Sequence, residues 1–443
     1  MPILAAFLMH FPFATPAASR PALTGDYHLL SGATLSSRPE LVPGIQRLSV
    51  NLDYRLDSAR LFVRNDFRNR FEASSDSLEW AFPEAWVELY FNRGDLRIGR
   101  QVIMPGLSLF QSPVNRLQPL DLRNFLLEPE PVLRRGTIAA NYSLYAGNHR
   151  IRLIVTPVFT ETLLPDPQNR WFFHIPVPGG LPFRIESTPN DQNAQAALLW
   201  NNARPGRFEL QAGVLYWTPS QPVYFKEILL PGLENPFHTP ELLLQESWFP
   251  GWVLTGGLSW EFTPSFTAVA EAAWFQKRAF DRIPEELLLF DLQNPVLISL
   301  PRILQIIGEE EDGFISKHQT IETALELLYT GTFLTIGAHW SAQIIYDPHP
   351  DVIQESVFHT LAATARRDFF RQRLQSELTT VFQPWGSDFW VRTEHSYDLM
   401  DNVTITLGAH FFGGPAPEAN YGHASFGSYR SNSLIYTGIR CFF

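Results

Sequence analysis

The sequence is poor in cysteine and in lysine. Its 443 residues include one cysteine, Cys441, and three lysines, Lys226, Lys277 and Lys317. A lone cysteine excludes an internal disulfide bond and a cysteine-based metal cluster, and we expect no metal and no other cofactor. The other 31 of the 34 basic residues are arginines. This excess is typical of a GC-rich genome, but it also suits a polar passage lined by rigid guanidinium groups.

Positive charge and long apolar runs are also scarce. Asp and Glu number 45 against 34 Lys and Arg, which gives a net charge of −11. That balance argues against a nucleic-acid-binding protein. Beyond residue 18, no segment approaches the ~20 apolar residues of a membrane-spanning helix. If the chain enters a membrane, we expect it to do so as β-strands.

Common catalytic motifs are absent from the sequence, which has no Gly-x-Ser-x-Gly, no His-Glu-x-x-His and no glycine-rich phosphate loop. His395 is followed by Ser396, and consecutive side chains of a strand point to opposite faces. We therefore predict that the protein is not an enzyme. A membrane-embedded hydrolase is the alternative.

Residues 1–18 form an apolar run that ends in small residues before Ser19 and Arg20. This pattern predicts a secretory signal peptide at residues 1–19 and a mature chain of residues 20–443. A buried N-terminal strand is the alternative.

Two early segments show the two-residue period of β-strands. In residues 45–56, Leu48, Val50, Leu52, Tyr54 and Leu56 alternate with polar residues, and residues 60–68 repeat the pattern. A soluble sheet buries its apolar face against a second layer. A barrel in lipid instead turns apolar side chains outward and polar side chains inward.

Short turns alternate with long connections along the rest of the chain. Turns are predicted at 57–58, 92–94, 146–148, 204–206, 263–265, 330–331, 366–368 and 400–402, and long connections at 104–132, 160–192, 219–250, 279–318 and 413–432. Short periplasmic turns and long outer loops are typical of outer-membrane barrels. We predict a single all-β domain, an antiparallel transmembrane β-barrel of about eighteen strands. Sixteen strands is the alternative, because a strand at 27–36 has a weak pattern.

The last eleven residues form the final predicted strand. Ile439, Cys441 and Phe443 share one parity, and Arg440 lies on the other. In outer-membrane barrels the terminal aromatic strand is also read by the assembly machinery. We therefore predict that Ile439, Cys441 and Phe443 form an assembly signal and that the barrel-assembly machinery is a partner.

The inward parity of the strands predicts a pore lined by charged side chains. These residues are Arg47, Arg55, Arg60, Arg64, Arg68, Arg97, Arg150, Arg152, Arg371, Arg373, Arg392, Arg440, Glu271, Glu322 and Glu326. The arginines gather on one wall when the barrel closes, and the opposite wall carries the three glutamates with Lys277 among its few bases. Such a wall creates a field that favours anions. Alternatively, the charges pair across neighbouring strands and only keep the lumen wet.

Residues 96–131 carry a family resemblance. A strand ending in Gly99, Arg100 and Gln101 leads to Asn115 and then to the element Pro119, Leu120, Asp121, Leu122 and Arg123. This resembles porin-like outer-membrane β-barrels broadly related to alginate-export channels, although Pro105 and Gly106 replace the usual Trp-Gly of that family. The resemblance extends to residues 150–165 and to the C-terminal strand, and it implies a barrel with no assigned substrate.

The segment 104–132 is the predicted constriction loop. Asp121 and Arg123 are expected to pair with charges of the barrel wall and to fold this loop inward, with Asn115 in the same loop. A capping turn at the rim is the alternative.

Together these patterns predict a passive channel for small solutes in the bacterial outer membrane. Its expected partners are outer-membrane lipid and lipopolysaccharide, the barrel-assembly machinery and a small-molecule solute, with no nucleic acid. The acidic run 309–312 is expected to be a solvated surface or a contact for divalent cations near lipopolysaccharide. A hydrolase and a non-conducting structural or adhesive barrel are the rival functions.

Overall fold

The computed structural model describes residues 21–36, 38–72, 75–124, 127–128, 130–172, 183–187, 194–202, 208–229, 241–284, 313–415 and 426–443. Three predicted features lie outside these residues: the signal peptide at 1–19, the turn at 204–206 and the acidic run at 309–312.

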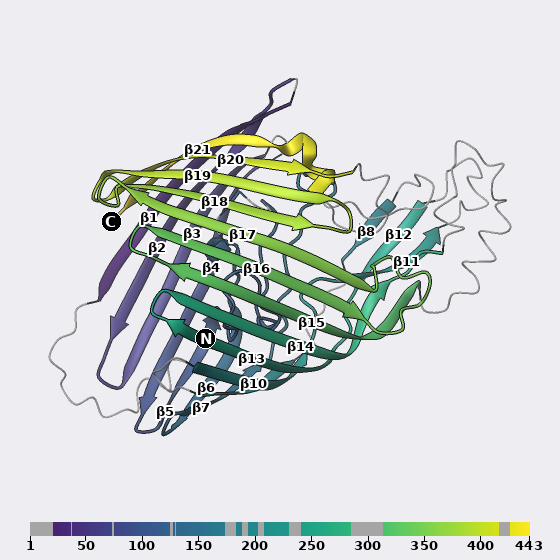
Figure 1. The fold of residues 1–443 in the computed structure, drawn as a ribbon, viewed down its shortest axis with the longest axis horizontal. Coiled ribbons are helices and arrows are strands. Elements are labelled where there is room, and N and C mark those ends of the chain that lie inside the picture. The colour runs from purple at the N-terminus through teal and green to yellow at the C-terminus, as the bar shows by residue number, and fades with distance from the viewer. Residues whose placement is uncertain are drawn as a thin grey trace.

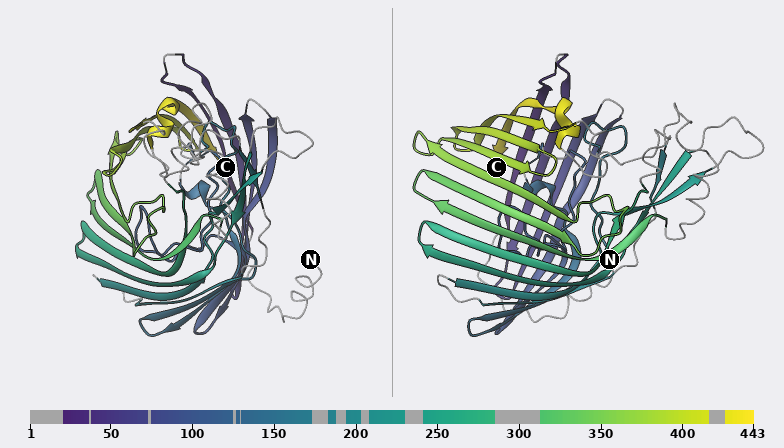
Figure 2. Two further views of the ribbon diagram at one scale, coloured as in Figure 1. Left: turned by 90° about the vertical axis from the view of Figure 1, so that its right-hand side faces the viewer. Right: turned by 45° about the vertical axis from the view of Figure 1, so that its right-hand side comes forward.

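The described residues form a closed antiparallel β-barrel of eighteen strands (Figures 1 and 2). The barrel strands are β1 (Ala22–Thr34), β2 (Leu41–Arg55), β3 (Ala59–Glu72), β4 (Ser75–Phe91), β5 (Gly94–Gln101), β6 (Thr137–Ala146), β7 (His149–Thr156), β9 (Gln195–Asn202), β10 (Phe208–Trp217), β13 (Gly251–Thr263), β14 (Phe266–Asp281), β15 (Ile315–Thr330), β16 (Leu334–Ile345), β17 (Val357–Phe369), β18 (Leu374–Gln383), β19 (Asp388–Met400), β20 (Val403–Gly413) and β21 (Leu434–Phe442). Consecutive barrel strands pair with each other, and β1 pairs with β21, so the sheet closes on itself. The predicted eighteen strands are confirmed, and the alternative of sixteen is wrong because the weakly patterned first strand closes the barrel.

The two faces of the strands differ as the alternation predicts. In β15, Leu325 is 49 % exposed, whereas Glu326 beside it is buried. Exposed apolar side chains continue around the barrel at Ile98, Ile151, Leu198, Leu254, Ile336, Leu361, Leu378, Ile405 and Ile435. Apolar side chains outside and charged side chains inside are the arrangement of a barrel that sits in a bilayer.

Tight turns lie at the end of the barrel that carries Phe443, and the long connections lie at the other end (Figure 1). The predicted turn at 366–368 is wrong, because β17 continues to Phe369 and the turn follows at 370–373. Its residues 370, 371 and 372 have positive φ angles of 50°, 56° and 71°. This left-handed stretch reverses the chain in four residues without a glycine, so the usual turn signal is missing from the sequence.

A β-bulge in β14 changes which side chains face the lumen. The register between β14 and β15 shifts between Phe275 and Arg278. As a result Arg278 contacts Glu322 on β15, while Lys277 is exposed. The prediction that Lys277 faces the lumen is therefore wrong, because it assumed an unbroken two-residue period.

Three short elements lie outside the barrel wall or within its loops. A separate small sheet consists of β8 (Phe183–Glu186), β11 (Val223–Leu229) and β12 (Glu241–Ser247), which lie at the end of the long connections (Figure 1). The helix α2 (Glu130–Leu133) precedes β6, and the 3₁₀ helix η2 (Phe426–Asn432) precedes β21. No helix among the described residues is long and apolar enough to cross a membrane.

Candidate functional site: the lumen and its inserted loop

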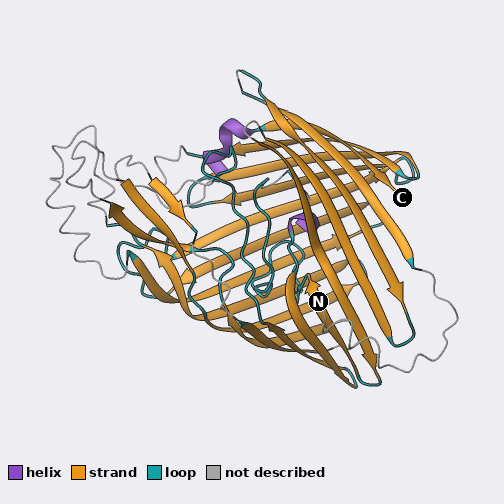
Figure 3. Ribbon diagram, turned by 180° about the vertical axis from the view of Figure 1, so that it is seen from behind, coloured by secondary structure: helices purple, strands orange, loops and turns teal. Residues whose placement is uncertain are grey.

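The connection between β5 and β6 comprises residues 102–136, and we call it the lumen loop. Its described residues, 102–124, 127–128 and 130–136, lie inside the barrel. Figure 3 shows loop segments that cross the interior between the walls. Side chains on three distant strands contact it: Arg68 on β3, Trp217 on β10 and Glu271 on β14. The loop thus joins opposite walls of the barrel.

The tip of the lumen loop is held by two carboxylates. The N–H groups of Leu107 and Ser108 donate to Glu271, at 2.7 Å and 3.3 Å. Glu326 on the neighbouring strand accepts from the Ser108 hydroxyl at 2.6 Å and from the Leu109 N–H at 2.9 Å. Hydrogen bonds from backbone N–H groups to an ionised carboxylate are among the stronger ones in proteins, so these two glutamates fix the tip to the wall.

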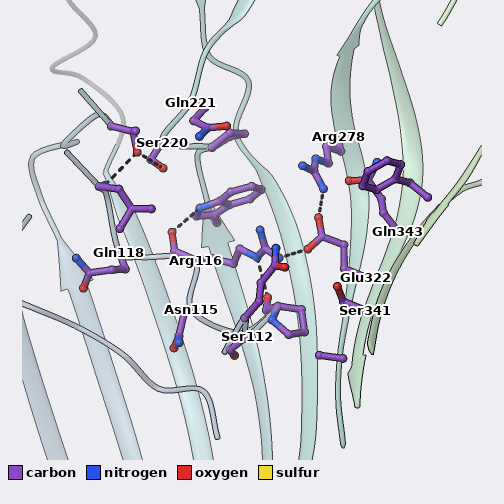
Figure 4. Close-up of a pocket in the computed structure, with 18 of the residues that line it drawn as sticks. Ser112, Asn115, Arg116, Gln118, Ser220, Gln221, Arg278, Glu322, Ser341 and Gln343 are labelled. Atoms are coloured by element: carbon purple, nitrogen blue, oxygen red, sulfur yellow. Dashed lines mark hydrogen bonds and ion pairs between the residues drawn. The ribbon is translucent and has the colours of Figure 1, made fainter. Parts of the chain in front are cut away.

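Beyond the tip, Arg116 reaches the same wall. Its guanidinium pairs with Glu322, which also pairs with Arg278 (Figure 4). The Trp217 indole donates to the Arg116 carbonyl at 2.8 Å. Burial lowers the pKa of Arg116, and the charge of Glu322 opposes that effect. Glu322 thus lies between two guanidinium groups, and the charge of Glu271 also acts on Arg116.

The returning limb of the loop contacts the arginine wall. Asp121 accepts from Arg68 of β3 at 3.2 Å and from Arg123 at 2.7 Å, and Arg123 also contacts Glu79 of β4 at 3.0 Å. Burial disfavours the charged form of Arg123. The hydrogen bonds and charges of Asp121 and Glu79 outweigh it and hold the pKa of Arg123 above its usual value. Asn115 has a local contact, because its side chain accepts from the Gly106 N–H at 2.7 Å.

Near the end of the loop, Glu128 contacts the wall where the barrel closes. The Arg47 guanidinium lies 3.0 Å from Glu128 and 3.5 Å from Asp26 of β1. Arg440 of β21 reaches the same Asp26 at 3.1 Å. The loop is therefore tied to the closing strands β1, β2 and β21 by one charge network.

Most predicted arginines of the pore wall are paired with carboxylates. The pairs on the strands are Arg55 and Arg60 with Asp53, Arg64 and Arg68 with Asp66, Arg97 with Glu88, and Arg392 with Glu377 and Glu394. Arg150 instead donates to the Ser143 hydroxyl at 2.8 Å, and the buried Nε of Arg152 has no hydrogen-bond partner among the described residues. Arg60, Arg97 and Arg392 pair with a carboxylate of a neighbouring strand. Arg55, Arg64 and Arg68 instead pair with a carboxylate two residues away on their own strand. The alternative of pairing across strands thus describes part of this wall.

Two residues of the predicted wall do not line it. Arg371 and Arg373 lie in the exposed turn 370–373 that follows β17. Both predictions are wrong because the strand ends before them. Conversely, sequence reasoning missed Arg116, which lies in a loop, and Arg278, whose facing depends on the bulge.

A cavity of about 730 Å³ lies between the lumen loop and the wall formed by β14 to β17. Figure 4 shows polar groups around it. They are Ser112, Asn115, Arg116, Gln118, Ser220, Gln221, Arg278, Glu322, Ser341 and Gln343. Trp217, Phe249, Phe280 and Phe358 add aromatic surface. This volume is within the range of about 300–1,000 Å³ that is typical of small-molecule sites.

The side chains of the C-terminal strand alternate between the outer surface and the lumen of the barrel, as the sequence alternation predicts. Ile435 and Thr437 are exposed, whereas Tyr436 is buried and donates to Glu394 at 2.7 Å. Phe443 extends the pairing, since its backbone exchanges hydrogen bonds of 2.8 Å and 3.0 Å with Gly25.

A histidine–serine pair occurs on the outside of the barrel. The side chains of His395 and Ser396 do not hydrogen bond to each other, since Ser396 pairs with Thr406. The Nδ1 of His395 lies 2.9 Å from the hydroxyl of Ser376, its cross-strand partner on β18. Among the described residues no carboxylate hydrogen bonds to His395, which is exposed. A serine nucleophile needs a base that is itself oriented, so this pair lacks the third member of a triad.

No protein-family model and no curated protein matches this sequence. Solved structures do match. OccK5 (OpdH) of Pseudomonas aeruginosa aligns with a TM-score of 0.51 at 9% sequence identity, over 96% of this chain and 97% of that chain. OccAB3 of Acinetobacter baumannii aligns with a TM-score of 0.50 at 8% identity, over 96% and 99%. This likeness shows the fold alone, a closed antiparallel β-barrel of the same type as in those two structures. The finer relation to alginate-export channels stays a prediction.

Proposed function

We propose that the protein is a passive channel of the bacterial outer membrane, in which the lumen loop narrows the path for small polar solutes. The observation that carries this proposal is the lumen loop, which is bound to opposite walls and leaves beside it a cavity of about 730 Å³ lined by both polar and aromatic side chains. A lumen of eighteen strands is too wide for side chains alone to fill. A loop inside it therefore sets the width that a solute meets.

The apolar outer face supports a place in the outer membrane, where lipid and lipopolysaccharide would surround the barrel. Cleavage of residues 1–19 as a signal peptide and recognition of Phe443 by the assembly machinery belong to the same proposal.

The charges around the cavity support a weak preference for anions. Arg116 and Arg278 share Glu322, and Asp281 at the outer end is paired with Lys226 at 2.5 Å. The net positive charge that remains is small, and mobile ions screen it over about 8–10 Å at physiological salt. Selectivity should therefore be modest.

Planar-bilayer recording tests the channel and its constriction together. We expect open channels whose conductance rises when residues 106–113 are replaced by a short Gly-Ser linker, because the linker removes the contacts with Glu271 and Glu326. Replacing the largely exposed turn 384–387 with a Gly-Ser linker is the control and should leave conductance unchanged. If the loop variant folds and conducts like the unaltered protein, the loop does not form the constriction. If the unaltered protein does not conduct at all, the channel proposal is wrong.

Reversal potentials in a salt gradient test the charge preference. We expect weak anion selectivity that moves toward cations in Arg278→Gln, because Glu322 then balances Arg116 and the second guanidinium charge is gone. Strong cation selectivity that Arg278→Gln leaves unaltered would contradict this assignment.

A further inference from the structure

His339 occupies an unusual position beside the tip of the lumen loop. It lies on β16 with 5 % of its surface exposed, and neither ring nitrogen has a hydrogen-bond partner among the described residues. Its ring is covered by Phe110 of the loop, with the ring centroids 5.0 Å apart. Buried polar groups are usually hydrogen-bonded, so an imidazole with two free nitrogens suggests a role other than stabilising the fold.

The groups packed against His339 are few. Glu326 is its cross-strand partner on β15, Ala362 is its partner on β17, and Phe110 covers it from the loop. Glu326 is therefore the charged group that faces His339 from these elements. The same Glu326 carboxylate accepts from the Ser108 hydroxyl and from the N–H groups of Leu109 and Phe110, the last at 3.4 Å.

We propose that Glu326 and His339 form a proton-operated latch that holds the tip of the lumen loop against the wall at neutral pH and releases it when His339 takes up a proton. This inference rests on the proposed channel function. Glu326 and His339 are positioning residues, because they act on the solute path through the loop.

Two effects favour release in acid. A proton from water on either free nitrogen makes His339 a cation, which attracts the Glu326 carboxylate away from the N–H groups of Leu109 and Phe110. The imidazolium also gains hydration when the Phe110 ring moves off it, because a buried charge without a partner is costly. Both effects weaken the attachment of Leu109 and Phe110, so these residues are the part of the tip that moves, while Glu271 still holds Leu107 and Ser108.

Single-channel conductance against pH tests the latch, with each value normalised to the conductivity of the bathing salt. Imidazoles change charge between about pH 5 and pH 8, and most carboxylates stay ionised above about pH 5. Because burial disfavours the charged form of an imidazole, we expect conductance to rise toward the acidic end of this range, close to pH 5. In His339→Phe, which keeps a ring under Phe110 but cannot titrate, we expect the rise to disappear. In His395→Phe, which removes an exposed histidine on the outer face, we expect it to remain.

Glu326→Ala tests the same latch by removing the carboxylate that holds the tip. Without the carboxylate, the tip should already be released at pH 8, so conductance should be high and nearly independent of pH. A conducting Glu326→Ala channel with the conductance of the unaltered protein at pH 8 would overturn the proposal, as would an unchanged pH response in His339→Phe.

A second experiment measures the movement of the tip in a protein that keeps both Glu326 and His339. Leu109 lies at the tip and is exposed to the cavity, so a polarity-sensitive fluorophore can be attached at Leu109→Cys in a Cys441→Ser background. We expect its emission to shift between pH 8 and pH 5. A constant emission would overturn the latch. A protein that conducts at pH 8 without a pH response refutes the latch alone, whereas a protein that conducts at no pH refutes the channel.

Discussion

Replacing Arg47 with methionine measures how firmly the lumen loop is fixed to the barrel wall. The Arg47 side chain is 1 % exposed and lies between Glu128 of the loop and Asp26 of β1, at 3.0 Å and 3.5 Å. After the replacement Asp26 keeps Arg440 at 3.1 Å, whereas Glu128 keeps the amide of Asn124 at 3.5 Å. A buried charge left without its partner costs about 3–5 kcal/mol. We expect a loss of that size in the free energy of unfolding.

Reversible urea unfolding in lipid vesicles, followed by tryptophan fluorescence, measures this loss. Adding Glu128→Gln to the Arg47→Met protein removes the unpaired charge, so about 2 kcal/mol should return. Arg55→Met is the matched control on the same strand and face. Its side chain is 70 % exposed and pairs with Asp53, so its loss should be below about 1 kcal/mol. Equal losses in Arg47→Met and Arg55→Met, or no recovery in the double variant, would refute the reasoning.

Two further predictions concern the outside and the end of the barrel. Leu325→Arg places a charge on the exposed face of β15. It should lower the free energy of unfolding by about 2–4 kcal/mol if the residue lies near mid-bilayer, and Ile439→Arg, nearer the rim, should cause a smaller loss. If unfolding in vesicles shows no loss for Leu325→Arg, Leu325 does not face lipid. Deleting Phe443 removes the backbone pairing with Gly25 and the proposed assembly signal, so the amount assembled in outer membranes should fall far more than the amount synthesised, and normal assembly would contradict the signal.

The number of strands and the direction in which their side chains point could be predicted, because the alternation of apolar and polar residues is visible within each strand. Period-two alternation is local, so β2 was expected at residues 45–56 and is observed at Leu41–Arg55. The same alternation separates Arg60 and Arg64 from the apolar outer face. Local patterns fail where the backbone departs from a regular strand. The bulge in β14 hides Arg278, and the left-handed turn at 370–373 removes Arg371 from the wall.

Partners of the lumen loop could not be predicted, because they depend on which walls the loop reaches in space. Leu107 and Glu271 are far apart in the chain, and nothing in either segment alone indicates their hydrogen bond. The same holds for Phe110 and His339, since a lone histidine in a strand is compatible with many surroundings. What the sequence does indicate is the charge of each wall, and that charge limits how the loop can lie.

The lumen loop matches the charge asymmetry of the two walls. Its carboxylates, Asp121 and Glu128, meet Arg68 and Arg47 on the arginine-rich side. One of its cations, Arg116, and the N–H groups of its tip meet the glutamates of β14 and β15 on the other side. Another cation, Arg123, lies on the arginine-rich side, where it pairs with Glu79 and Asp121. Turning the loop around would separate Asp121 and Glu128 from Arg68 and Arg47 and would separate Arg116 from Glu322, and breaking buried pairs of this kind is costly. The separation of charge between the walls therefore orients the loop first, and the field that a solute meets is what remains after this pairing. That remainder is small, which is why we expect the position of the loop to control passage more strongly than the charge of the wall does.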